Sequence, residues 1–169
     1  KRTVGTGKMT NLTLKLQEPD PVAFEPYGLF VIPPDQPGER HFFSDALRVR
    51  NEASSPVLHV NSLQPQALPF SFLQVERHPH AVQCFFPLDV SRYAVVVMPS
   101  DADGRACPEK ALGFLMQGTV GVIFHSGVWH LGATVLDRLG HFTVMMWRGG
   151  VPQDDEFQNI EPLTLTLPI

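Results

Sequence analysis

Four side chains of the types that bind metal ions occur in two separate segments of the sequence: Glu76, His78, Gln83 and His130. Glu76 ends the run Phe70–Glu76, and His78 lies two residues later. On an extended strand the side chains of these two residues point to the same face. A proline follows His78 and favours a turn, after which Gln83 can return an oxygen donor to that face. His130 ends a glycine-containing turn and can enter from a second hairpin. We predict one interior site held by these four residues.

Carboxylate, amide and imidazole donors together suit a borderline divalent ion such as nickel, manganese, zinc or iron(II). The set contains no thiolate, which argues against a closed structural zinc site. On an uninterrupted strand His80 would share the face of Glu76, but Pro79 interrupts the strand, so we expect His80 on an exposed turn. The remaining histidines have no partners at a comparable spacing and are expected at the surface or hydrogen-bonded within strands: His41, His59 and His141.

Short apolar runs separated by turn residues must position this site. Their β-branched and aromatic content predicts an all-β fold, a cupin-like antiparallel barrel or jelly roll. The expected strands cover residues 28–32, 57–62, 70–76, 83–88, 93–98, 111–116, 120–124 and 141–147. One or two helical turns are expected after Asp20, which can cap a helix that begins at Pro21 and ends before Gly28.

The two ends of the chain carry separate expectations. Residues 1–10 are expected to form a disordered leader, and residues 11–169 a single domain. The alternating run Leu163–Pro168 predicts an edge strand that packs through one face, and the polar segment Pro152–Asn159 predicts a solvated loop.

Composition excludes several classes of function. The net charge of -4 is made of dispersed charges of both signs, which disfavours nucleic acid or an anionic membrane as a partner. No apolar run approaches the roughly 20 residues of a membrane helix, and the basic start lacks the apolar region of a signal peptide. We therefore expect a cytoplasmic protein. Cys84 lies in an apolar run and is expected to be a buried thiol rather than half of a disulfide.

The spacing of the site residues resembles the two motifs of the cupin superfamily. Glu76, His78 and Gln83 match the first motif, with Glu in place of its usual His and Gln in place of its usual Glu. His125, Gly127 and His130 match the second motif, with His125 in place of a usual proline. Pairing His78 with His80 instead would place Phe85, which cannot bind a metal, at the acidic position.

The chain resembles the ureidoglycolate lyase family of cupins over most of its length beyond the first twenty residues. The resemblance is carried by segments 23–28, 61–70, 75–88, 93–97, 121–130 and 148–150, of which ERHP, the Gln four residues later and HxGVWH are the most specific. Three positions depart from the family pattern, because Ser62, Leu131 and Trp147 replace polar residues.

The resemblance implies cleavage of (S)-ureidoglycolate into glyoxylate and urea, a step of allantoin breakdown, by a homodimeric barrel. It implies a metal held by the four donors above. His125 is predicted as the group that moves a proton, or else it hydrogen-bonds the turn and holds Trp129. Arg148 is a candidate carboxylate anchor, or else it serves the loop structure before Gly149. Trp129 is a candidate substrate platform or a packing aromatic.

Two other functions remain open at this point. Loss of three polar groups predicts a more apolar pocket, and hence a diverged cupin that binds or transforms another small hydroxy acid or sugar acid. A structural partner protein would instead use its outer sheet and have an occluded barrel.

Overall fold

The computed structural model describes residues 11–48, 50, 52–150 and 154–168. Most regular structure in these ranges is extended, in the strands β1 (Leu12–Lys15), β2 (Gly28–Val31), β3 (Ser55–Leu63), β4 (Phe70–Arg77), β5 (Gln83–Pro87), β6 (Arg92–Met98), β7 (Leu112–Gln117), β8 (Gly121–Phe124), β9 (Trp129–His130), β10 (Thr134–Leu136), β11 (Gly140–Arg148) and β12 (Glu156–Thr166). The helical elements are α1 (Pro21–Phe24) and the 3-10 turns η1 (Ser44–Arg48) and η2 (Pro108–Lys110). The prediction of an all-β chain is confirmed.

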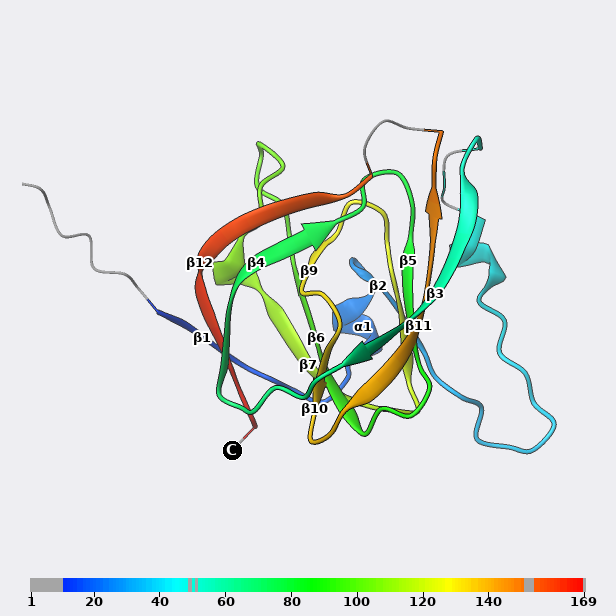
Figure 1. Cartoon of the computed structure of the whole chain (residues 1–169), viewed down its shortest axis with the longest axis horizontal. Coiled ribbons are helices and arrows are strands. Elements are labelled where there is room, and N and C mark those ends of the chain that lie inside the picture. Colours follow the sequence, from blue (N-terminus) through cyan, green and yellow to red (C-terminus); the bar gives the residue numbers. More distant parts are fainter. Residues whose placement is uncertain (1–10, 49, 51, 151–153, 169) are drawn as a thin grey trace, which may run out of the picture.

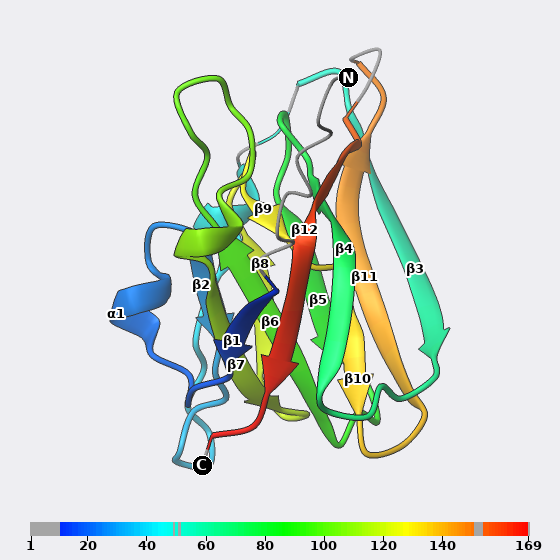
Figure 2. The same cartoon turned by 90° about the vertical axis from the view of Figure 1, so that its left-hand side faces the viewer.

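The strands form two curled sheets. One has the order β1-β12-β4-β9-β6-β10, with β7 also paired to β6, and the other has the order β2-β8-β5-β11-β3. Figure 1 shows the two sheets facing each other around a common interior, and Figure 2 shows α1 on one side of the molecule and β3 on the opposite side. The architecture is the expected cupin-like half-barrel, in which inward side chains of both sheets meet.

The start of the second sheet follows from two local features. Asp20 caps α1 through its side-chain oxygen, which accepts hydrogen bonds from the backbone N–H of Val22 at 2.9 Å and Ala23 at 3.2 Å. Gly28 then begins β2 so close to the neighbouring strand that a Cβ there would lie 2.0 Å from the Ile123 carbonyl oxygen. Only glycine fits this position. The predicted helix after Asp20 is confirmed, but it ends at Phe24, and a turn rather than helix leads from there to Gly28.

An aromatic core fills the interior between the sheets. Phe24, Phe30 and Phe114 form one group of ring contacts, with Phe24 stacked on Phe30 at a centroid distance of 4.2 Å. The Tyr93 hydroxyl donates to the Val120 carbonyl at 2.5 Å, which satisfies the polar tip of an otherwise buried ring. This core occupies one part of the interior and leaves the part lined by β4, β5 and β9 to polar residues.

Two predictions about the carboxyl-terminal region are wrong. Glu156–Asn159 belong to β12 and pair with β4 instead of forming a solvated loop; Pro152 and Gln153 lie outside the described residues. The run Leu163–Pro168 is not an edge strand, because its residues up to Thr166 pair with β4 on one side and in parallel with β1 on the other. The strand β1 was not predicted, and its pairing is what covers this edge. The expected leader, residues 1–10, also lies outside the described residues.

None of the helices in the described ranges is long and apolar enough to cross a lipid bilayer.

Burial of Cys84 leads to a testable pH dependence of stability. Both cysteines are free, and burial raises the pKa of the Cys84 thiol from its ordinary 9.0 to about 12. A thiol whose folded pKa is raised contributes stability that is complete below the unfolded pKa and is lost as pH rises through the folded one. We expect the free energy of unfolding to fall above pH 9.0.

Denaturant titrations at about pH 8 and about pH 10.5 measure this loss. The matched control is Cys84→Ala, in which the fall should be smaller. Burial also raises the pKa of Tyr93, but Tyr93 is present in both proteins and cancels in the difference. An equal fall in the two proteins would contradict the assignment to Cys84.

Candidate metal centre and its cavity

Two of the predicted donors face each other across neighbouring strands. Glu76 on β4 is paired in register with His130 on β9, so their side chains project to the same side of the sheet. The Glu76 Oε1 atom lies 3.5 Å from His130 Nε2. His130 is 1% exposed, and its ring stacks on Phe124 with a centroid distance of 4.1 Å. The aromatic ring of Phe124 therefore fixes the plane of this imidazole.

The other sheet contributes Gln83. Gln83 begins β5 beside Phe124 of β8, and its Oε1 atom lies 2.8 Å from His130 Nε2. The other ring nitrogen of His130, Nδ1, lies 2.9 Å from the Val128 carbonyl oxygen. When Nδ1–H donates to that carbonyl, Nε2 carries a lone pair and faces a second lone-pair atom on Gln83. Two acceptors at such a distance are favourable around a shared cation.

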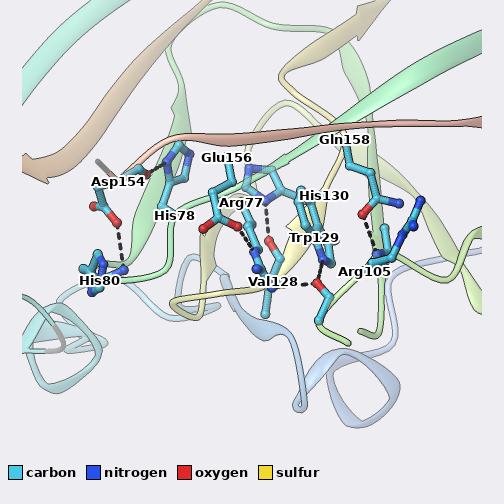
Figure 3. A network of polar contacts seen from close by, with 12 residues as sticks. Arg77, His78, His80, Arg105, Val128, Trp129, His130, Asp154, Glu156 and Gln158 are labelled. Carbon is cyan, nitrogen blue, oxygen red and sulfur yellow. Dashed lines mark hydrogen bonds and ion pairs between the residues drawn. The ribbon is translucent and has the colours of Figure 1, made fainter. Parts of the chain in front are cut away.

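His78 completes the group from the end of β4. Its Nδ1 atom lies 2.9 Å from both the Asp154 carbonyl oxygen and Asp155 Oδ1. Figure 3 shows His78 and His130 held from outside by Asp154 and Val128, respectively. Because Nδ1–H donates to these oxygens, His78 Nε2 is a lone-pair atom, and it is buried without a hydrogen-bond partner among the described residues.

The electrostatics of the group favour an ionised carboxylate. Burial by itself raises the pKa of Glu76, but the hydrogen bond to His130 and the charge that His130 and His78 carry when protonated outweigh burial and hold that pKa below its ordinary value. Glu76 is therefore negatively charged at neutral pH, in an interior lined by two imidazoles. Such a charge is stable inside a protein only with cationic partners.

This donor cluster (Glu76, His78, Gln83, His130) fits a metal ion by its own geometry. One ligand atom from each of Glu76, His78 and His130 lies within 4.8 Å of the others. The Nε2 atom of His78 is buried without a hydrogen-bond partner among the described residues, as expected of an atom that binds a metal. The Nδ1–H of the same ring donates to oxygen atoms, as it does in metal-bound histidines. The structure brings His78 and His130 together at one interior point, as the sequence predicted.

Three members of the cluster, Glu76, His78 and Gln83, line a cavity of about 230 Å³, called the site cavity below. Its polar lining beyond the cluster comes from His59, Asn61, Arg148 and Asp155, and its apolar lining from Phe85, Ala133, Val144, Met146 and Phe157. His130 is not part of this lining and contacts Glu76 and Gln83 from behind it. Arg148 contacts Asp155, whose carboxylate also contacts His78. A guanidinium is thus linked through one carboxylate to an imidazole of the cluster.

Two predicted site residues lie away from the site cavity. The Nε2 atom of His125 is 3.1 Å from the Glu25 carbonyl oxygen, on the side of β2. Trp129 is buried on the outer side of β9, donates its indole N–H to the Gly104 carbonyl at 3.0 Å and carries Arg77 over its ring at 4.5 Å. Neither contributes to the cavity lining. Trp129 packs as the alternative for it supposed, whereas the His125 ring contacts Glu25 rather than its own turn or Trp129. His80 is exposed on the turn, as expected.

The three departures from the family pattern also lie outside the site cavity. Ser62 is exposed and alternates in direction with Asn61, whereas Leu131 and Trp147 are buried in separate apolar clusters. The expectation that these substitutions make the pocket more apolar is therefore wrong. Their side chains belong to other faces of the strands.

Sequence reasoning missed three polar residues of the site cavity. His59 and Asn61 enter it because β3 pairs with β11 in a register that sets His59 opposite Val144 and Asn61 opposite Phe142. Asp155 enters it from the chain just before β12. The alternation within residues 57–62 was the one available signal, since it groups His59 with Asn61 on one face.

The fold and the site define the class of this protein: it is a cupin-like half-barrel with a cluster of His, Glu and Gln side chains in its interior that could bind a metal ion. A family model described as ureidoglycolate lyase matches residues 12–167. The chain is 36% identical over 79% of its length to a ureidoglycolate lyase of Burkholderia cepacia, covering 79% of that protein. It is 30% identical over 77% of its length to one of Agrobacterium fabrum, covering 76% of that protein. The chain belongs to the ureidoglycolate lyase family, a family of enzymes.

Proposed function

We propose that this protein cleaves ureidoglycolate to glyoxylate and urea in its site cavity. The observation that carries the proposal is the grouping of Glu76, His78 and His130, of which Glu76 and His78 line a cavity that is also lined by the guanidinium of Arg148. The substrate is a carbinolamine with a carboxylate, so its cleavage needs a cationic anchor, a base for the hydroxyl proton and an acid for the departing nitrogen. Membership of the family supports the same reaction.

Three residues that line the cavity can perform these three tasks. Arg148, already paired with Asp155, offers N–H donors to the substrate carboxylate. Glu76 is ionised and half-buried, which suits it to accept the hydroxyl proton as the carbonyl of glyoxylate forms. The carbon–nitrogen bond then breaks, and the nitrogen needs a proton. His59 is the imidazole that lines the cavity outside the cluster, so we assign this proton to His59.

The sequence-based assignment of proton transfer to His125 remains a competing proposal. It requires the ring to leave the Glu25 carbonyl oxygen and turn toward the cavity. His59 needs no such rearrangement. A role for Trp129 in substrate binding would similarly require movement of a buried side chain.

A divalent ion, of which nickel, manganese, zinc and iron(II) suit these donors, would be held by Glu76, His78, Gln83 and His130. When bound, it supplies positive charge that binds an α-hydroxy carboxylate and acidifies the hydroxyl. His78 and His130 are already oriented for this role by the oxygens that hold their Nδ1 atoms.

The wider setting of the enzyme follows from the same family. We propose a cytoplasmic homodimer that acts in allantoin breakdown on a small-molecule carboxylate. Support for self-association comes from β3, which within the described part of the chain pairs with β11 alone and exposes Leu58 and Val60. Sedimentation velocity of the purified chain distinguishes a dimer from a monomer.

Turnover is tested by giving purified protein ureidoglycolate and following urea release against the spontaneous rate, with and without each of the four metals. We expect an acceleration of at least about a hundredfold, the usual contribution of positioned acid–base groups. Absence of acceleration under all these conditions would refute the proposed substrate. Stabilisation of the fold by other hydroxy acids or sugar acids, measured as a shift in Tm, would then favour the alternative of a diverged cupin.

A further inference from the structure

Asn61 lines the site cavity, and its side chain contains an unsatisfied hydrogen-bond acceptor. Its Oδ1 atom is buried and has no hydrogen-bond partner among the described residues. It shares this property with the Nε2 atom of His78, and both residues line the same cavity. A buried acceptor left without a donor costs roughly 1–3 kcal/mol, so an oxygen of this kind is usually satisfied by water or by a ligand.

Register sets the position of Asn61 within the cavity. Along the paired strands β11 and β3, Arg148 lies at one end, the pair Val144 and His59 follows, and Phe142 opposite Asn61 comes last. The two residues of β3 that line the cavity, His59 and Asn61, are therefore displaced along the strands from the Arg148 end. A substrate whose carboxylate is held near Arg148 extends its other end toward these two residues.

The two ends of ureidoglycolate differ in hydrogen-bonding character. The carboxylate only accepts hydrogen bonds, whereas the ureido end carries N–H donors. A neutral amide oxygen is complementary to N–H donors and offers nothing to a second carboxylate. Phe85 and Val144 add apolar walls to the same cavity.

We propose that Asn61 is a specificity-determining residue of this enzyme, whose side-chain oxygen accepts a hydrogen bond from the ureido end of the substrate. The inference rests on the proposed function. It assigns recognition of the leaving group to β3 and distinguishes ureido substrates from hydroxy acids that lack an N–H donor. A site built to bond a polar group rejects analogues that lack it, because its own polar atom stays unpaired.

The test compares the wild type with Asn61→Leu, which keeps the approximate size and removes the acceptor, and with Asn61→Asp, which keeps an acceptor. Steady-state rates with ureidoglycolate, and product inhibition by urea and by glyoxylate, are measured separately. We expect Asn61→Leu to lower kcat/KM by about tenfold to a hundredfold and to weaken inhibition by urea, with inhibition by glyoxylate unchanged. Asn61→Asp should retain inhibition by urea.

Ser62→Ala is the matched control, since Ser62 is the next residue on β3 and its side chain is exposed outside the cavity. It should match the wild type in every measurement, and Tm confirms that each variant is folded. An active wild type with unchanged urea inhibition in Asn61→Leu overturns this inference alone. Equal weakening of urea and glyoxylate inhibition also overturns it. A wild type that does not convert ureidoglycolate overturns the proposed function, and the inference with it.

Discussion

Replacing His130 with alanine should lower kcat/KM for ureidoglycolate by at least about a hundredfold. The Nε2 atom of His130 contacts both Gln83 and Glu76, so the substitution removes the group around which the other donors are arranged. It also removes the hydrogen-bond partner that helps to hold the pKa of Glu76 below its ordinary value. His78→Ala should give a loss of the same order, because it deletes the buried nitrogen that has no partner among the described residues.

Rates and bound metal are measured on the same preparations. His80→Ala is the control, since His80 lies two residues from His78 but is exposed on the turn; it should stay within about twofold of the wild type. His130→Asn keeps a polar group in the space against Phe124 and separates loss of chemistry from loss of packing. Full activity in both His78→Ala and His130→Ala would mean that the site is elsewhere.

Asp155→Asn should weaken metal binding or activity by about tenfold to a hundredfold, although Asp155 belongs to neither hairpin that carries the donors. Its carboxylate contacts Nδ1 of His78 on one side and Arg148 on the other. An amide in its place removes the charge that orients and polarises the imidazole, and it releases Arg148 from its ion pair. We expect both lower metal affinity and a higher KM.

The measurements are metal affinity, by competition with a chromogenic chelator, and kcat and KM determined separately. Together they distinguish a role of Asp155 in positioning His78 and Arg148 from a role in stability alone. Asp137→Asn is the control, because Asp137 also pairs with an arginine, Arg92, but at a site that is not part of the cavity lining. A change in Tm without any change in metal affinity or KM would show that Asp155 serves the fold alone.

The sequence predicts the donor cluster well because its information is local. Glu76 and His78 are separated by the period of a strand, a proline marks the turn before Gln83, and His130 ends a tight turn. The structure has these four residues together, although their chemical roles are still predictions. Alternating apolar runs likewise predict most strands, and the cap at Asp20 predicts α1.

What the sequence does not predict depends on pairing between distant segments. His59 and Asn61 reach the cavity only through the register of β3 on β11, about eighty residues further along the chain. Glu156–Asn159 are too polar to be recognised as a strand, and they become one because β4 supplies a partner. The resemblance to the family placed Ser62 near the pocket, whereas strand alternation turns its side chain to the opposite face from Asn61.

The donor cluster draws on both sheets, since Glu76 and His130 come from one and Gln83 from the other. An ion bound by these side chains would cross-link the two sheets, in addition to the side-chain packing and the contact between His130 and Gln83 that already join them. Binding of the metal would then raise the free energy of unfolding of the whole barrel, and its removal would lower it.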